Sequence, residues 1–264
     1  MKIFQYVLLV VLCHPVFSQM NEVYELFPDT TIELNDSNIQ ISGYDDDYNY
    51  FEIEGNYHIN KYRDFTFYEV LDKSFVVFKS DYWIYLLGKD GSIFHGARRN
   101  QDDRAPTEGI YKRFGAFESS SFFVEELKNI EIQYDPSRLL DWDIRTGWVE
   151  GARGDGIGET LSFSLKNKSR TSSLIFYNGF IEPRNIDLFY KNARLKDFSI
   201  QIDSGEIYNF TLEDSPNEQI VYLPEKSNSF ILTILSSYPG SKYSDLAING
   251  LYANMHPDYY EIKF

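Results

Sequence analysis

Three oxygen-bearing side chains, Asp141, Asp143 and Thr146, lie close together in the chain. Carboxylate and hydroxyl oxygens are the hard donors that Ca²⁺ prefers, and backbone carbonyls of the same loop can complete its coordination. The spacing is therefore compatible with a structural calcium site. The alternative is that Asp141 and Asp143 accept hydrogen bonds from the amides of their own turn, as acidic residues in turns commonly do.

A glycine-rich segment follows, with Gly151, Gly154, Gly156 and Gly158 ahead of an alternating run, 160–165. Glycine is favoured where the backbone turns through positive φ, so the segment predicts a tight loop. A phosphate-binding loop would need a helix directly after the glycines, and one of its common forms would also need a Lys followed by Ser or Thr. The run instead alternates with the period of a half-buried strand, so we expect the loop to join two strands and to bind no nucleotide.

Several side chains near the ends of the expected strands suit carbohydrate recognition. Sugars have C–H faces that stack on aromatic rings and hydroxyl groups that need directed hydrogen-bond partners. Two of these side chains have an alternative role, in which Glu150 and Arg194 form a buried ion pair that stabilises the fold. We expect Trp148 to be a core residue. The candidate ligand-binding residues are Glu150, Arg153, Asp155, Tyr177, Arg194 and Tyr238.

The sequence offers little catalytic chemistry. Glu150 and Glu159 could act as the two carboxylates of a glycosidase, but their separation depends on the fold. Cys13 is the only cysteine, and it lies in a segment that we expect to be removed. The histidines show neither catalytic context nor the ligand spacing of a zinc site, so we expect no enzyme. They are His14, His58, His95 and His256.

Residues 1–18 resemble a signal peptide, with Lys2 ahead of an apolar run, 6–12, and small Ser18 before Gln19. The apolar run is too short to span a bilayer. A lipoprotein with an acylated Cys13 is the alternative, but bulky Leu12 stands where a small residue is expected. We therefore expect a secreted, periplasmic or surface-exposed protein without disulfides.

The formal net charge is −15, and aromatic residues make up 17% of the chain, with 21 Tyr and 21 Phe. Nucleic acids and anionic membrane surfaces require clustered Lys and Arg, so the acidic balance argues against both as partners. The aromatic content is typical of β-rich proteins with aromatic binding surfaces.

Short β-type segments recur along the whole chain, and no long helical period interrupts them. Residues 19–114 predict a small β-rich domain, with a hairpin turn at 88–91, and a polar linker over 97–112 places the boundary near Gly115. A short helix is expected over 122–129. Residues 115–264 predict an eight-stranded jelly-roll β-sandwich with functional loops at one end. The expected strands are 30–34, 50–54, 65–71, 74–79, 82–87, 173–177, 198–202, 206–212, 219–223, 230–235 and 247–252.

The motifs of residues 115–264 resemble the discoidin-like, galactose-binding-like domain, and more narrowly the bacterial family named for the glycan-binding, translocation-assisting domain of a secreted NAD glycohydrolase. One departure stands out: the wider family usually has Gly between the two acids, where this chain has Trp142. A bulky residue at this position alters the turn beside which many relatives hold a structural calcium ion. The motifs are Tyr134, Leu139-Leu140-Asp141-x-Asp143-x-x-Thr146-x-Trp148-Val149-Glu150-Gly151, Gly154-Asp155-Gly156-x-Gly158-Glu159, Tyr177-Asn178-Gly179-Phe180, Tyr190-x-Asn192-x-Arg194-x-Lys196 and Tyr238-Pro239-Gly240-x-Lys242-Tyr243-x-Asp245.

The resemblance implies a non-catalytic β-sandwich that presents loops to carbohydrate or to a surface partner. Three functions remain open from the sequence. The first is a bacterial glycan-binding or protein-binding module, and the second is a structural or adhesin-like envelope protein that binds no sugar. The third is an enzyme whose activity resides in residues 19–114, which the resemblance does not cover.

Overall fold

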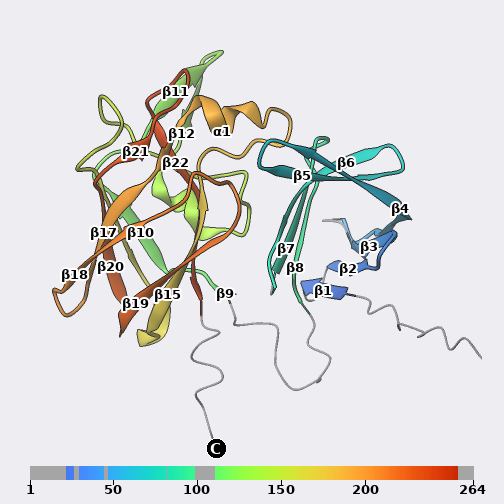
Figure 1. Cartoon of the computed structure of the whole chain (residues 1–264), viewed down its shortest axis with the longest axis horizontal. Coiled ribbons are helices and arrows are strands. Elements are labelled where there is room, and N and C mark those ends of the chain that lie inside the picture. Colours follow the sequence, from blue (N-terminus) through green and yellow to red (C-terminus); the bar gives the residue numbers. More distant parts are fainter. Residues whose placement is uncertain (1–21, 27–29, 45–46, 82, 99–110, 255–264) are drawn as a thin grey trace, which may run out of the picture.

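The computed structural model describes residues 22–26, 30–44, 47–81, 83–98 and 111–254. A β-barrel and a β-sandwich follow one another in the chain and lie side by side, with the sandwich on the left of Figure 1 and the barrel on the right. The all-β fold class is therefore confirmed. The expected signal peptide lies outside the described residues. No helix within the described ranges is long and apolar enough to cross a bilayer.

The barrel is a closed sheet in which each strand pairs with the next along the chain and β1 pairs with β8. Gly96 permits this closure, because a Cβ there would lie 2.9 Å from the backbone nitrogen of Glu25 on β1. Alternate side chains such as Ile32, Phe75 and Ile84 fill the interior. The strands are β1 (Glu22–Leu26), β2 (Thr30–Leu34), β3 (Asn38–Tyr44), β4 (Tyr50–Tyr62), β5 (Phe65–Val70), β6 (Lys73–Lys79), β7 (Trp83–Gly88) and β8 (Ile93–Arg98).

The sandwich consists of a five-stranded sheet, in the order β10-β14-β20-β17-β18, and a seven-stranded sheet that contains β19-β15-β22-β16-β21. The short strands β13 and β9 both pair with β22, so the strands outnumber the eight expected, while the sandwich itself is confirmed. The core between the sheets contains Trp148, as expected, together with Phe163 and Phe230. The bounds are β9 (Tyr111–Lys112), β10 (Ala116–Ser119), β13 (Trp148–Val149), β14 (Thr160–Ser164), β15 (Thr171–Asn178), β16 (Ala193–Leu195), β17 (Asp197–Ile202), β18 (Ile207–Thr211), β19 (Gln219–Ser227), β20 (Ser229–Ile234), β21 (Ser237–Tyr238) and β22 (Leu246–Asn254).

In the part of the chain that the structure describes, helical structure is limited to the α-helix α1 (Asp187–Lys191) and two short 3₁₀ helices, η1 (Pro136–Leu140) and η2 (Lys166–Lys168). The helix expected over 122–129 is wrong. That segment contains β11 (Val124–Leu127), which pairs with β12 (Ile130–Gln133) to form a hairpin.

The tight turn of this hairpin explains the error. Lys128 and Asn129 both have positive φ, 51° and 66°, which is the conformation of a two-residue hairpin turn. The segment lacks the Asn-Gly or Asp-Gly pair that usually signals such a turn, so its sequence was compatible with a helix.

The sandwich begins before Gly115 in the structure. Lys112 and Tyr111 of β9 pair with Ala253 and Asn254 of β22, so these residues already belong to the seven-stranded sheet. The barrel ends at Arg98 with β8. The change from one domain to the other therefore falls within the expected linker.

An aromatic cluster joins the outer face of the barrel to the outer face of the seven-stranded sheet. Phe78 and Tyr85 of the barrel contact Tyr177 of β15, with ring centroids 6.0 and 5.5 Å apart. Trp142 stacks between Trp83 of the barrel, at 5.0 Å, and Tyr252 of β22, at 4.9 Å. The side chain that departs from the wider family is therefore part of the contact between the two domains.

The burial pattern of β22 reflects this contact. All nine of its residues are buried: one face lies in the sandwich core, and Tyr252 on the other face packs in the aromatic cluster with the barrel. The strand β7 is likewise buried along its whole length, with Ile84 and Leu86 inside the barrel and Tyr85 and Leu87 against the sandwich.

Polar contacts surround the aromatic cluster. The hydroxyl of Tyr190 on α1 donates to Asp64 at 2.8 Å, and the guanidinium of Arg63 lies 4.3 Å from the Tyr190 ring centroid. Arg145 donates to the carbonyl of Gly91 in the β7–β8 turn. Contacts at separate points fix the orientation of the barrel on the sandwich.

Candidate functional site

The glycine-rich loop after β13 is held in place by Glu150. This side chain is completely buried, and its carboxylate accepts hydrogen bonds from the amides of Ala152, at 2.7 Å, and Leu246, at 3.3 Å. Burial raises the pKa of Glu150 above its usual range. Gly156 has φ of 70° and passes so close to Glu150 that a Cβ there would lie 2.8 Å from the Glu150 Cγ. Glu150 therefore shapes the loop from beneath.

Arg194 on β16 is an anchor for three other segments. Its Nε and Nη2 donate to the two carboxylate oxygens of Asp214 at 2.9 and 2.7 Å, and its Nη1 donates to the carbonyls of Asn192 and Pro239. Only 6% of the Arg194 side chain is exposed, compared with 38% for Asp214. The expected ion pair between Glu150 and Arg194 is therefore wrong. Arg194 forms a buried ion pair, but its partner is Asp214.

Tyr177 and Tyr238 occupy different environments. Tyr177 is buried between the sandwich and the barrel, and its hydroxyl donates to Glu218 at 2.8 Å. Tyr238 is half-buried, and its hydroxyl donates to the carbonyl of Leu212 at 3.0 Å. The ring of Tyr177 thus has a packing role, whereas Tyr238 keeps part of its surface at the loop end of the sandwich.

The structure brings Asp155 together with the loop after β21 in a hollow of about 320 Å³ that we call the loop pocket. Arg153 is exposed on the same glycine-rich loop, two residues from Asp155. Of the six candidate residues, Asp155 alone lines the pocket. The lining consists of Asp155, Ala193, Pro239, Gly240, Ser241, Lys242, Tyr243 and Ser244.

Backbone hydrogen bonds fix the far wall of the loop pocket. The amides of Lys242 and Tyr243 donate to the carbonyl of Lys191 at the end of α1, at 3.1 and 2.8 Å. A Cβ at Gly240 would lie 2.1 Å from the carbonyl oxygen of Tyr243, so this turn requires glycine. Ser237 donates to Asp155 at 3.3 Å and so links the two walls.

The loop pocket combines three kinds of recognition group. Asp155 supplies a carboxylate acceptor, Lys242 an ammonium donor and Tyr243 an aromatic ring that is 38% exposed. The Lys242 ammonium lies 4.7 Å from the centroid of the Tyr243 ring. Lys242 and Tyr243 were not among the candidates, although both stand in the Tyr-Pro-Gly-x-Lys-Tyr motif. Their positions in that motif were the feature of the sequence that could have identified them as candidates.

The residues proposed for calcium are already engaged by the protein. Asp143 forms a two-point ion pair with Arg145, with distances of 2.8 and 2.5 Å, and also accepts from the Arg145 amide. Asp141 accepts from the amide of Asp143 at 2.9 Å and from the hydroxyl of Thr146 at 3.2 Å. Burial raises the pKa of Asp141.

This donor set does not fit a calcium ion. The guanidinium of Arg145 occupies the side of Asp143 that a cation would need, and Ca²⁺ takes six to eight oxygen ligands in proteins. Within the described ranges, no three His, Cys, Asp or Glu side chains gather as a metal site. The geometry agrees with the alternative interpretation, in which the acids hold the amides of their own turn.

We expect EDTA to leave the melting temperature of the protein unchanged. An ion that binds only the folded state raises the melting temperature, so its removal would lower it. Differential scanning fluorimetry with EDTA, compared with the same protein in added CaCl₂, measures the effect. A lower melting temperature in EDTA that CaCl₂ restores would contradict the structural assignment of Asp141 and Asp143.

The two carboxylates considered for glycoside hydrolysis have structural partners. Glu150 is buried and bonded to two amides, and Glu159 accepts from the hydroxyl of Ser120 at 2.6 Å. A catalytic acid or base must reach the proton that it transfers. Both carboxylates are instead engaged within the fold, Glu150 by two amides and Glu159 by Ser120.

Several solved structures are similar to about half of this chain. The chain is similar to the carbohydrate-binding module of family 32 of AlyQ in complex with 4,5-unsaturated mannuronic acid, with 14% identity and a TM-score of 0.38, covering 55% of this chain and 97% of that one. It is also similar to the family 32 module from C. perfringens NanJ in complex with galactose, with 17% identity and a TM-score of 0.38, covering 55% and 98%. The lectin domain of lectinolysin complexed with Lewis B antigen has 10% identity and a TM-score of 0.37, covering 56% and 97%.

Among curated proteins, no significant match was found. The family assignment depends on the sequence of the second domain. The model of the NAD glycohydrolase translocation F5/8 type C domain matches residues 111–254, which is more than half of the chain and coincides with the sandwich. The chain therefore belongs to the NAD glycohydrolase translocation F5/8 type C domain family.

Proposed function

We propose that this chain is a secreted, non-catalytic binding protein whose sandwich recognises carbohydrate through the loop pocket. The observation that carries the proposal is the convergence of Asp155, Lys242 and Tyr243 on one hollow at the loop end. A saccharide needs both directed polar partners and a ring beside its C–H face, and these three side chains offer both. Arg153 and Tyr238 remain proposed secondary contacts from the adjoining loops.

Family membership supports a binding role, since the family resemblance implies a module that presents loops to a ligand. The burial of Glu150 and the engagement of Glu159 argue against hydrolysis by this domain. The proposed location outside the cytoplasm depends on the export signal expected in residues 1–18. A glycan array probed with this protein identifies the class of sugar that it binds.

Asp155→Ala and Tyr243→Ala are each expected to weaken binding of the array-positive sugar by about tenfold or more. Asp155→Ala removes a hydrogen bond to a charged group, which costs about 1.5–3 kcal/mol, and Tyr243→Ala removes the aromatic ring beside the sugar. A loss of 1.4 kcal/mol corresponds to about a tenfold change in affinity. Isothermal titration calorimetry with the isolated sugar measures the change.

Two variants provide matched controls. Glu126 is an exposed carboxylate on the β11–β12 hairpin, and Tyr222 is a tyrosine on β19 that is 62% exposed. Glu126→Ala and Tyr222→Ala should bind the sugar as the original chain does. Equal losses in the control and pocket variants would contradict recognition through the loop pocket. If no array glycan binds, a structural envelope role becomes the better assignment.

A further inference from the structure

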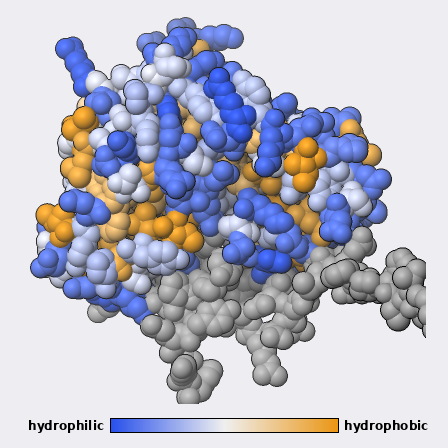
Figure 2. Space-filling view, viewed as in Figure 1, coloured by the Kyte–Doolittle hydropathy of each residue, from blue (hydrophilic) through white to orange (hydrophobic). Residues whose placement is uncertain are grey.

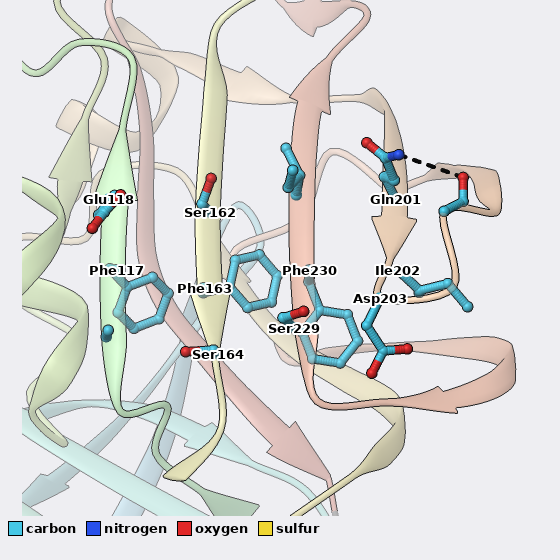
Figure 3. Close-up of a pocket in the computed structure, with 13 residues that line it drawn as sticks. Phe117, Glu118, Ser162, Phe163, Ser164, Gln201, Ile202, Asp203, Ser229 and Phe230 are labelled. Atoms are coloured by element: carbon cyan, nitrogen blue, oxygen red, sulfur yellow. Dashed lines mark hydrogen bonds between the residues drawn. The ribbon is translucent and has the colours of Figure 1, made fainter. Parts of the chain in front are cut away.

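A second hollow, of about 460 Å³, lies on the outer face of the five-stranded sheet, and we call it the sheet groove. It crosses β10, β14, β20 and β17 (Figure 3), and none of the residues that line it lines the loop pocket. The barrel packs on part of the outer face of the other sheet, at Tyr177 and Tyr252. Residues of the sheet groove such as Glu118 and Ile231 are exposed instead. The contact between barrel and sandwich therefore does not account for the sheet groove.

Strand register places the side chains of the sheet groove in two rows. Glu118 pairs with Ser162, Ser162 with Ile231, and Ile231 with Gln201. Ala116 pairs with Ser164, and Ser164 with Ser229, in the second row. Figure 3 shows Glu118, Ser162 and Gln201 at one level of the sheet and Ser164, Ser229 and Asp203 at the next. Four strands spaced by about 4.8 Å give the rows a length of about 14 Å.

The floor of the sheet groove carries hydroxyls that the protein does not use. The side chains of Ser162, Ser164 and Ser229 form no hydrogen bond with any described residue, although each hydroxyl can donate once and accept twice. The three belong to two neighbouring strands and point to the same side of the sheet. Small side chains at these positions keep the floor low and leave the hydroxyls open to a ligand.

The ends of the rows carry acceptors, and the described residues that line the groove include no Lys or Arg. Glu118 is exposed and has no partner within the described ranges. Asp203 pairs with Arg170 at 2.9 Å, and the amide nitrogen of Gln201 donates to the carbonyl of Gly205 at 3.4 Å, which leaves the Gln201 oxygen as an acceptor. This charge pattern disfavours an anionic ligand and suits a neutral one that carries many hydroxyl groups.

An apolar surface accompanies the polar floor. Ile231 lies in the first row and is 40% exposed. Figure 2 shows an apolar area on the left side of the molecule, over the part of the sandwich where β10, β17 and β20 lie in Figure 1. An apolar side chain between hydroxyls can contact the C–H face of a sugar ring while its neighbours bond the hydroxyls.

We propose that the sheet groove is a second binding site, which takes a neutral linear oligosaccharide lying across the strands. The two rows suit an extended ligand with repeated hydroxyl groups, and the unpaired Glu118 accepts from one of them at the end. The ligand class depends on the proposed function, but the site is separate from the loop pocket. A peptide that adds to a sheet would use an edge strand and not this face.

The test uses the full chain carrying Asp155→Ala, in which the loop pocket is impaired. Cellohexaose, mannohexaose and chitohexaose are titrated separately by isothermal titration calorimetry. At least one of them should still bind, and the added substitution Ser162→Tyr, which fills the floor, should weaken that binding by about tenfold or more. Tyrosine is well tolerated on an outer strand position, so the sheet should remain folded.

Thr233→Tyr is the matched control, because Thr233 lies on β20 and pairs across to Thr160 outside the sheet groove. It should leave the affinity within about twofold. The double substitution Ser162→Ala and Ser229→Ala removes hydroxyls without adding bulk and should also weaken binding. Circular dichroism checks that each variant is folded.

The outcomes separate this site from the loop pocket. Binding in the Asp155→Ala chain that is insensitive to both the Tyr and the Ala substitutions would overturn the sheet groove. Loss of all hexaose binding on Asp155→Ala alone would overturn it too, while supporting the loop pocket. An array-positive sugar that is insensitive to Asp155→Ala but sensitive to Ser162→Tyr would support the sheet groove and contradict the loop pocket.

Discussion

Arg194→Ala is expected to lower the free energy of unfolding by about 3 kcal/mol, near the lower end of the cost of breaking a buried ion pair. The variant leaves Asp214 without its cation and removes the donor for the carbonyls of Asn192 and Pro239. The partial exposure of Asp214, whose side chain is 38% accessible, keeps the loss from being larger. Urea denaturation measures it.

Arg194→Lys is the informative control for this variant. Lysine keeps the charge but cannot bond both oxygens of Asp214 and two carbonyls in the same plane, so it should restore only part of the stability. The sequence alone predicted that Arg194 contacts a ligand. A ligand-contacting role requires that Arg194→Ala loses sugar binding and keeps the unfolding free energy of the original chain. An unchanged unfolding free energy with lost sugar binding would contradict the anchoring role described above.

Trp142→Ala is expected to destabilise the protein by about 2–4 kcal/mol, since large aromatic-to-alanine changes in fully buried cores cost about 3–5 kcal/mol and Trp142 is half-buried. The variant removes the ring that stacks on Trp83 and Tyr252. The contact between barrel and sandwich should weaken as a result. Thermal unfolding followed by near-ultraviolet circular dichroism reports on these rings directly.

A double-mutant cycle distinguishes the stacking from the general loss of volume. Trp83→Ala and Trp142→Ala remove one partner each, and the double variant removes both. If the two rings stabilise each other, their coupling energy should be about 1 kcal/mol. Fully additive losses would show that Trp142 does not act through the barrel.

The hydrophobic periodicity predicted most of the strands because each strand has its own local pattern. The segment 30–34 coincides with β2, and 247–252 lies inside β22. The sandwich was also predictable, since its motifs lie at the ends of the strands and in the loops that follow them. The helix expected over 122–129 failed because the turn at Lys128 and Asn129 lacks the Asn-Gly or Asp-Gly pair that usually signals a two-residue hairpin turn.

The contact between domains could not be predicted in the same way. The continuous apolar run of β7 is typical of a strand that is buried on both faces, but a single sequence does not say which distant strand covers the second face. Trp142 likewise indicated a packing partner, because a large aromatic residue stands between the two acids. Only the fold showed that this partner is Trp83 of the barrel.

The site residues were predicted by chemical type, and the types did not determine exposure. Glu150, Tyr177 and Arg194 have suitable chemistry but are buried with structural partners. The partner of Arg194 is Asp214, which belongs to none of the recognised motifs, so the motifs could not indicate this pairing. Asp155 lines the loop pocket, while Lys242 and Tyr243 could be identified only once the fold showed this hollow.

The most direct test of the account is a glycan array probed in parallel with the original chain, Asp155→Ala and Glu126→Ala. We expect the original chain and Glu126→Ala to bind the same defined class of sugar, and Asp155→Ala to lose that binding. A chain that binds no glycan, or three proteins that bind alike, would contradict carbohydrate recognition through the loop pocket.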